Sequence, residues 1–144
     1  MRLFKILCIT LIFMLYGCAV STKHSNPEIV YVPTIEAAER SAEMLSMIVN
    51  GKGYHIYGNS MYPNVLPNDV VVAVNRGFDK SLLGKVVVYK SNWTREPVCH
   101  RLILRDFYGY MAMGDNNSIM DPQIRINKEN YLGEVVTIYR SVKK

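Results

Sequence analysis

The chain has 144 residues, of which 49% are hydrophobic and 20% are charged, and its formal net charge is +5 at pH 7. This composition is typical of a folded protein and excludes a disordered chain, and the length fits a single domain with a modest core. The basic residues are too scattered along the sequence to predict a nucleic-acid-binding surface. The three cysteines, an odd number, do not suggest a disulfide framework.

The first 17 residues form a predicted targeting segment. It has two basic residues near its start, an apolar run over residues 6–15, and the ending Leu15-Tyr16-Gly17-Cys18. This ending resembles a bacterial lipobox, which predicts lipid attachment at Cys18 on the extracytoplasmic side of a membrane. The alternative is that the segment stays attached as an uncleaved membrane anchor. In either case we expect the domain to be tethered to a membrane.

A tether and a single helix follow the targeting segment. Residues 18–33 are polar and contain two prolines, and one apolar stretch at residues 29–32 predicts an extended piece within this tether. Residues 34–50 predict one amphipathic helix, because apolar residues recur three or four positions apart and Thr34 can cap its start. Asn50-Gly51 ends it. We expect the apolar face to pack on the domain, with contact to lipid or to a membrane partner as the alternative.

Short strands replace the helical pattern after residue 51. Turn residues separate runs that are rich in valine, isoleucine and tyrosine, which is the pattern of strands. The predicted strands are Tyr54–Tyr57, Val70–Asn75, Lys85–Lys90, Val98–Arg105, Tyr108–Met113 and Tyr131–Tyr139. Residues 51–144 therefore predict a mainly β, partly barrel-like domain, with the helix attached on its N-terminal side.

One serine lies in a turn that is dense in residues that bend the chain. The sequence runs Gly58-Asn59-Ser60-Met61-Tyr62-Pro63, and further asparagine, proline and aspartate residues follow before a valine-rich strand. These residue types favour turns, so we expect the hydroxyl of Ser60 to be exposed at a strand end. Ser60 is the candidate nucleophile, and an ordinary polar loop is the alternative.

A base and an orienting group for such a serine follow later in the chain. His100 lies in an apolar run of strand type, and the turn Gly114-Asp115-Asn116-Asn117 and Asp121 come after it. A serine nucleophile needs a neighbouring base, and the base needs a group that orients it. Side chains alternate along a strand, so His100 should face away from Cys99 and Arg101. This argues against a Cys-His pair and predicts that Cys99 is a small buried residue.

The order of these blocks is specific. Gly-Asn-Ser-Met-Tyr-Pro lies at residues 58–63, Asn-Asp-Val-Val at 68–71, His-Arg at 100–101, and Gly-Asp-Asn-Asn at 114–117, with Asp121 beyond. Over roughly residues 54–140 the chain resembles type I signal peptidases. Most bacterial members of that family carry a lysine base, whereas the endoplasmic-reticulum type carries a histidine, and this chain resembles the histidine branch. The resemblance implies the same mainly β architecture.

The resemblance also implies roles for individual residues. Ser60 would attack the substrate, with His100 as its base. Asp121 would orient His100, and Asp115 is the second choice for that role. Otherwise Asp115, together with Asn116, would hold the turn beneath the histidine.

The oxyanion that forms in acyl transfer needs hydrogen-bond donors. The main-chain N–H of Ser60 is the first candidate, and Asn59 or another backbone group would supply a further one. Many signal peptidases carry a serine two positions before the nucleophile, where this chain has Gly58. The sequence therefore leaves the second donor open.

The leading hypothesis is a membrane-tethered serine endopeptidase that cleaves exported, signal-peptide-bearing proteins after small residues, a preference that follows from the resemblance alone. The expected partners are such substrates and a membrane, and not nucleic acid. A non-catalytic lipoprotein of the same fold that binds a peptide at a sheet edge is the alternative. A repressor-type autoprotease is a third class, but it would require a lysine base and a DNA-binding segment, and the predicted export signal argues against it. His24 and His55 lack the spacing of a zinc site, and no metal or cofactor is expected.

Overall fold

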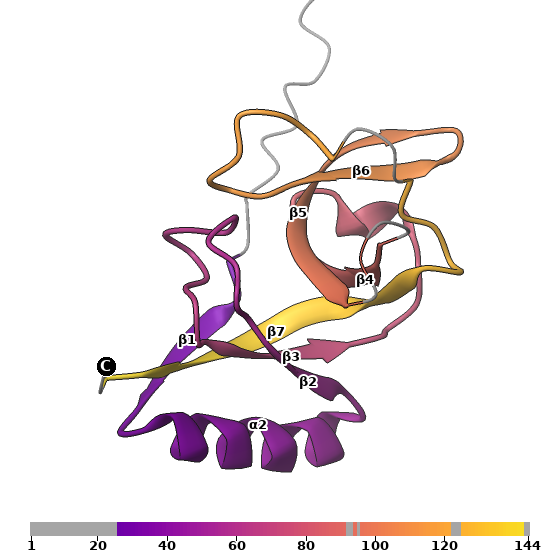
Figure 1. Cartoon of the computed structure of the whole chain (residues 1–144). Coiled ribbons are helices and arrows are strands. Elements are labelled where there is room, and N and C mark those ends of the chain that lie inside the picture. The colour runs from indigo at the N-terminus through magenta and orange to yellow at the C-terminus, as the bar shows by residue number, and fades with distance from the viewer. Residues whose placement is uncertain (1–25, 92–93, 95, 122–124, 143–144) are drawn as a thin grey trace, which may run out of the picture.

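The computed structural model describes residues 26–91, 94, 96–121 and 125–142. In these ranges the chain forms a seven-stranded sheet, one α-helix and one short 3-10 helix (Figure 1). The strands are β1 (Glu28–Val32), β2 (Lys52–His55), β3 (Val70–Val74), β4 (Val86–Lys90), β5 (Pro97–Asp106), β6 (Gly109–Met113) and β7 (Tyr131–Ser141). The helices are α2 (Ile35–Val49) and η1 (Lys80–Leu82). The prediction of a mainly β domain with one N-terminal helix is confirmed.

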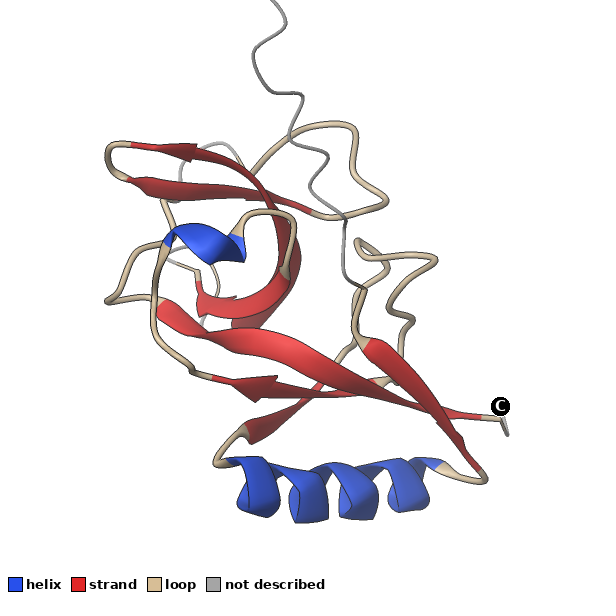
Figure 2. Ribbon diagram, turned by 180° about the vertical axis from the view of Figure 1, so that it is seen from behind, coloured by secondary structure: helices blue, strands red, loops and turns tan. Residues whose placement is uncertain are grey.

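The sheet follows the strand order β2-β3-β7-β4-β5-β6, and each neighbouring pair on this path is antiparallel. The long strand β7 lies in the middle, where it pairs with β3 and, near its start, with β4. Seen from behind, the sheet curls strongly and β5 bends toward the end of the molecule that carries β6 (Figure 2). Within the described residues β2 and β6 do not pair with each other, so the sheet is curled like part of a barrel but open.

The helix begins and ends at the predicted residues. The Thr34 side chain caps its start by accepting the Ala37 N–H (3.2 Å), and Asn50 ends it in the left-handed conformation at φ 52°. Ala38 and Ala42 are fully buried in a cluster with valines of β3, because small residues let the helix lie close to the sheet. The helix thus covers one end of the sheet (Figure 1).

Strand β1 occupies part of the predicted tether. Residues 28–32 pair in parallel with the end of β7, from Glu28 opposite Thr137 to Val32 opposite Ser141. The local sequence pattern indicated only an extended piece, because a partner more than 100 residues away leaves no local trace. The folded domain therefore begins ahead of the helix.

The targeting segment, Cys18 and the first part of the tether lie outside the described residues. In the part of the chain that the structure describes, no helix is long and apolar enough to cross a membrane.

Two apolar clusters pack against the strands β4 and β5. One contains Met61, Val65, Val71, Val88 and Cys99, and the other contains Val87, Tyr89, Leu102 and Tyr110. Because side chains alternate along β4, Val88 belongs to the first cluster and its neighbours belong to the second. The site described next lies against both clusters.

Candidate active site

Ser60 lies in the turn that joins β2 to β3. Its neighbours Met61 and Val65 are fully buried (1% and 0% exposed) and anchor the turn in the core. The turn is closed by main-chain hydrogen bonds from Tyr62 N–H to the Asn59 carbonyl (3.2 Å) and from Val65 N–H to the Met61 carbonyl (3.0 Å). The anchored turn holds the hydroxyl of Ser60 toward β5.

His100, on β5, is the residue that this hydroxyl meets. Ser60 Oγ lies 2.9 Å from His100 Nε2, and His100 Nδ1 lies 2.6 Å from Asp121 Oδ2. An ionised carboxylate can only accept, so Nδ1 carries the hydrogen and Nε2 is left to accept the serine proton. Residues separated by 40 and 21 positions in the sequence thus form one hydrogen-bonded chain.

Asp121 is held by its main chain and by a tyrosine. Its N–H donates to the Ala112 carbonyl of β6 (2.9 Å), and its Oδ2 also accepts from the Tyr89 hydroxyl (2.5 Å). Burial raises the pKa of Asp121, but the hydrogen bonds from His100 and Tyr89 outweigh it and hold that pKa below its usual value. The carboxylate therefore stays charged beside the imidazole at neutral pH.

Tyr89 is a site residue that the sequence analysis missed. It is fully buried on β4 (1% exposed), and burial and the contact with Asp121 raise its pKa, so the hydroxyl keeps its hydrogen and donates it. Tyr89 pairs with Val98 across β4 and β5, which places it diagonally opposite His100 on the same face. Its hydroxyl oxygen lies 3.4 Å from His100 Nδ1. The only signal in the sequence was one aromatic residue with a polar tip after a run of valines.

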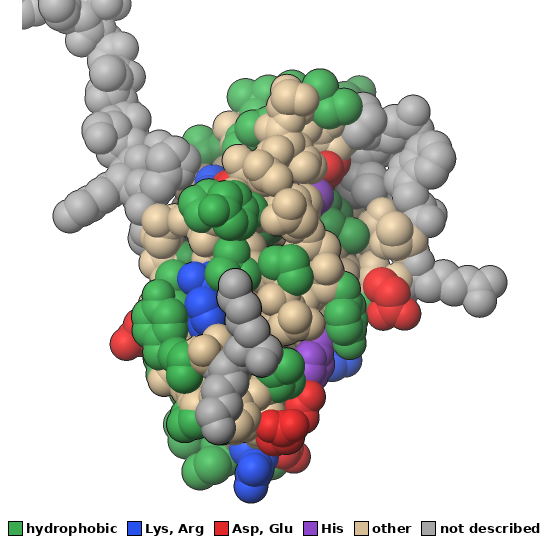
Figure 3. Space-filling view, turned by 60° about the vertical axis from the view of Figure 1, so that its left-hand side comes forward, with side chains coloured by type: hydrophobic (Ala, Val, Ile, Leu, Met, Phe, Trp, Pro, Cys, Tyr) green, Lys and Arg blue, Asp and Glu red, His purple; other side chains and the backbone are tan. Residues whose placement is uncertain are grey.

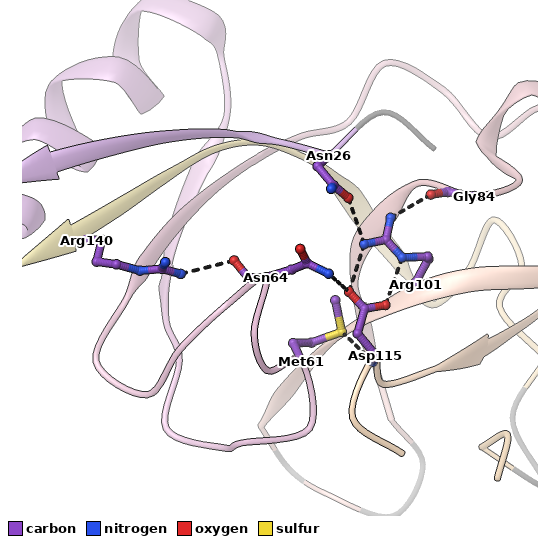
Figure 4. A network of polar contacts seen from close by, with 7 residues as sticks. All are labelled: Asn26, Met61, Asn64, Gly84, Arg101, Asp115 and Arg140. Atoms are coloured by element: carbon purple, nitrogen blue, oxygen red, sulfur yellow. Dashed lines mark hydrogen bonds and ion pairs between the residues drawn. The ribbon is translucent and has the colours of Figure 1, made fainter. Parts of the chain in front are cut away.

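Arg101 and Asp115 form a second charged group, which Figure 4 shows with its neighbours. Arg101 Nε and Nη2 each lie 2.8 Å from a different oxygen of Asp115, a two-pronged pair. The same guanidinium donates to the Gly84 carbonyl (2.9 Å) and to Asn26 Oδ1 (3.0 Å). Burial raises the pKa of Asp115, but the hydrogen bonds from Arg101 and Asn64 outweigh it and lower that pKa overall. Asp115 thus neutralises the charge of Arg101 and accepts a hydrogen bond from Asn64 of the Ser60 turn.

Asn64 ties the Ser60 turn to two ion pairs. Its side-chain amide donates to Asp115 Oδ2 (2.7 Å), and its main-chain carbonyl accepts from Arg140 Nη2 (3.0 Å; Figure 4). Arg140 of β7 in turn pairs with the buried Asp69 (2.7 Å), which also accepts the Leu66 N–H. Buried ions need such partners to offset their lost hydration. The turn is therefore held by both ion pairs.

The turn at residues 114–117 packs directly on the main chain of Ser60. Asn116 N–H donates to the Ser60 carbonyl (2.8 Å), and Asn116 Nδ2 donates to the Asn59 carbonyl (3.2 Å). A Cβ at Gly114 would lie 2.4 Å from the Ser60 carbonyl oxygen, so this approach requires glycine. Asn59 and Asn116, which were predicted as supporting residues, are thus joined by this second hydrogen bond.

A groove passes Ser60 between β2 and the first half of β5. A pocket of about 340 Å³ is lined by Ser60, Met61 and residues 55–58 and 96–99, and a neighbouring pocket of about 310 Å³ continues along β2 to Lys52. On β5, β6 pairs only from Arg101 onward, and in the described ranges β2 pairs only with β3. The groove is therefore bordered by two strand edges that no described strand covers.

The comparison with known proteins agrees with the resemblance seen in the sequence. Over 93 residues, 61% of the chain, it is 30% identical to the signal peptidase complex catalytic subunit SEC11 of Clavispora lusitaniae. The chain is a distant relative of a signal peptidase. It spans about half of that curated relative, 55% of its length, and no family model matches the chain. The suspected resemblance to signal peptidases is confirmed.

Two residues near Ser60 bear on the likeness to signal peptidases. A Cβ at Gly58 would meet no atom within 4 Å, so this position has room for the serine that many signal peptidases carry. Cys99 is buried with Met61 in the core, and burial raises its pKa to about 12, so it stays a thiol. Within the described ranges no three His, Cys, Asp or Glu side chains are grouped as metal ligands. Ser60 is therefore the candidate nucleophile that borders the groove.

Proposed function

We propose that this chain is a membrane-tethered serine endopeptidase that cleaves exported proteins bearing signal peptides. The observation that carries the proposal is the hydrogen-bonded chain from Ser60 through His100 to Asp121, set beside a groove with uncovered strand edges. The distant relative, a signal peptidase catalytic subunit, supports the same class of reaction.

Acylation begins at Ser60. His100 Nε2 accepts the hydroxyl proton as Ser60 Oγ attacks the scissile carbonyl carbon, and Asp121 stabilises the imidazolium through Nδ1. The imidazolium then gives its proton to the leaving amine, and the N-terminal part of the substrate stays on Ser60 as an ester. A water molecule, deprotonated by His100, hydrolyses this ester and restores the free serine.

The developing oxyanion needs donors close to Ser60. The Ser60 main-chain N–H is the first donor in this proposal. Asn59 or another main-chain group of the same turn supplies the second donor in this proposal. The contacts that Asn116 makes with the Ser60 and Asn59 carbonyls keep this part of the turn rigid, which favours donors that are already aimed before the substrate arrives.

The groove suits an extended peptide. Main-chain groups on the uncovered edges of β2 and β5 can pair with a substrate strand laid between them, which holds its scissile bond at Ser60. The preference for small residues before the cleaved bond is carried over from the resemblance to signal peptidases. Side-chain specificity would then depend on the pocket next to Ser60.

The membrane attachment belongs to the same proposal. The lipobox-like ending at residues 15–18 motivates a mature chain that begins at lipidated Cys18, on the extracytoplasmic side of a membrane. Cys18→Ser should abolish labelling by a radioactive or alkyne-bearing fatty acid. Mass spectrometry that finds Met1 to Cys18 intact on the membrane-bound protein would establish an uncleaved anchor in its place.

The activity is tested with the full chain in detergent and a panel of peptides that contain export signals. Products identified by mass spectrometry should show cleavage after small residues, and Ser60→Ala should leave the peptides intact. Binding of the peptides without cleavage by the unaltered chain would contradict the proposal and favour a non-catalytic peptide-binding lipoprotein of the same fold. Equal cleavage by the chain and by Ser60→Ala would reveal a contaminating protease.

A further inference from the structure

Asn116 binds two consecutive carbonyls of the Ser60 turn. Its side-chain Nδ2 donates to the Asn59 carbonyl (3.2 Å), and its main-chain N–H donates to the Ser60 carbonyl (2.8 Å). Both carbonyl oxygens therefore point toward the same residue. A trans peptide is planar, so its C=O and N–H bonds point in opposite directions. The N–H groups that share these two peptide planes, those of Ser60 and Met61, consequently both point away from Asn116.

The Ser60 turn lies between Asn116 and the groove. Ser60 and Met61 line the pocket of about 340 Å³, whereas none of residues 114–117 lines it. Figure 3 shows this side of the molecule, where histidine side chains reach the surface at two places and hydrophobic and uncharged groups lie between them. N–H groups that point away from Asn116 therefore face the groove in which a substrate would lie.

Neither of these two N–H groups has a hydrogen-bond acceptor within the described ranges. The main-chain bonds of the turn use the N–H groups of Tyr62, Val65 and Asn116. Met61 is 1% exposed, and its sulfur lies 3.4 Å from the Asp115 nitrogen. A buried main-chain N–H without a partner is rare, because the lost hydration is not compensated. Such a donor beside a candidate nucleophile indicates a place for a charged oxygen.

The two donors are suited to bind one oxygen together. Successive main-chain N–H groups on one side of a turn form a concave site for an anion. Here that site adjoins the Ser60 hydroxyl, where the carbonyl oxygen of a bound substrate becomes negative on attack. Gly58 has no side chain that donates a hydrogen bond at this place. The main chain therefore provides both donors.

We infer that the N–H groups of Ser60 and Met61 together form the oxyanion hole, and that Asn116 is the residue that positions them. The inference rests on the proposed function, in which Ser60 is the nucleophile, and it names the second donor that the sequence left open. Asn116 does not touch the substrate. It holds the two peptide planes so that both donors are aimed before charge develops, which is how such donors favour the transition state.

The positioning role is tested by Asn116→Ala, which removes the side-chain bond to Asn59 and keeps the main-chain bond to Ser60. The residue is exposed, so the variant should fold. On peptide substrates kcat should fall roughly 10- to 100-fold with KM unchanged, because a donor is misaimed and not removed. Asn117→Ala is the matched control, since Asn117 lies in the same turn and its side chain binds neither carbonyl. A rise in KM at constant kcat, or equal losses in both variants, overturns the inference.

A peptide aldehyde locates the donors directly. Ser60 Oγ adds to its carbonyl carbon, His100 takes the proton, and the carbonyl oxygen becomes the anion that the hole must bind. In NMR spectra of the isotope-labelled full chain in detergent, the amide hydrogens of Ser60 and Met61 should both move downfield, because each gains a charge-assisted hydrogen bond. Those of Tyr62 and Val65 should stay in place, because they are already bonded within the turn.

The outcomes separate the inference from the proposed function. Movement of the Ser60 amide hydrogen without that of Met61 overturns the inference and leaves the peptidase activity standing. Unchanged kcat in Asn116→Ala, with both amide hydrogens moving as in the unaltered chain, reduces Asn116 to packing and also overturns it. If neither an adduct with the aldehyde nor cleavage of any peptide is found, the proposed function itself fails, and the inference fails with it.

Discussion

The adjacent residues His100 and Arg101 of β5 each meet a different aspartate. His100 bonds Asp121 at 2.6 Å through a single oxygen, which Tyr89 shares, whereas Arg101 grips both oxygens of Asp115 at 2.8 Å. A histidine can change its charge near neutral pH and an arginine cannot. One pair is therefore suited to moving a proton, and the other to holding a turn. Because neighbouring side chains of a strand point to opposite faces, two adjacent residues of β5 can have different roles. His100 faces the candidate nucleophile, and Arg101 faces the turn that it stabilises.

The largest effect is expected when the proton-moving pair loses its imidazole. His100→Ala should lower turnover on the order of 10⁶-fold, the size found when such a base is removed from a serine-protease triad. Lys85→Ala is the matched control, because Lys85 lies on the approach to β4 and pairs with Glu134 (3.0 Å). Turnover of peptide substrates decides the matter: an inactive Lys85 variant beside an active His100 variant would reverse the assignment of the base.

The two aspartates give the next largest contrast. Asp121→Asn should cut turnover by up to ~10⁴-fold, because the amide neither stabilises the imidazolium nor fixes its tautomer. Its thermal unfolding temperature should change little. Asp115→Asn should keep most of its turnover once it is folded. Rate and unfolding temperature measured on both variants would show the roles to be exchanged if Asp115→Asn were the folded, inactive one.

The supporting pair should appear in stability and in its pH dependence. Asp115→Asn leaves the buried Arg101 without a counter-charge, which should lower the free energy of unfolding by about 3 kcal/mol. The pKa of Asp115 is lowered in the folded chain, so its contribution is present above the unfolded value of about 3.9 and is lost as the pH falls below it.

Denaturant unfolding between neutral pH and pH 3 measures this contribution. The unaltered chain should lose more stability on acidification than Asp115→Asn, which has no carboxylate to protonate at that position. Parallel pH profiles for the two chains would show that the Arg101 pair adds nothing to stability.

The smallest effect is expected at Tyr89. Tyr89→Phe removes one hydrogen bond to the Asp121 carboxylate, so kcat should fall about tenfold, with KM unchanged. Tyr110→Phe is the control, since the Tyr110 hydroxyl binds the Asp79 carbonyl in the same cluster. A loss of stability without a change in kcat would make Tyr89 a packing residue, and equal rate losses in both variants would point to the shared cluster.

Local pattern predicted the helix better than the strands. The span Ile35–Val49 agrees with the structure at both ends, because a cap at Thr34 and a left-handed residue at Asn50 are local features. The strand expected at Tyr54–Tyr57 instead lies at Lys52–His55, because pairing with β3 decides where it begins and ends. The short helix η1 was not predicted, since three residues carry no periodicity.

The amino-acid sequence by itself determined which residues can carry the chemistry. A serine in a tight turn, a histidine in an apolar strand and an aspartate after a glycine-asparagine turn are chemical types that stay the same in any fold, and alternation along residues 98–105 already separated His100 from Cys99 and Arg101. Only the tertiary structure decided which partners meet. Asp121 on His100, Asp115 on Arg101, Tyr89 behind Asp121 and β1 beside β7 depend on register and curl, and contacts between residues far apart in the chain leave no periodic trace in it.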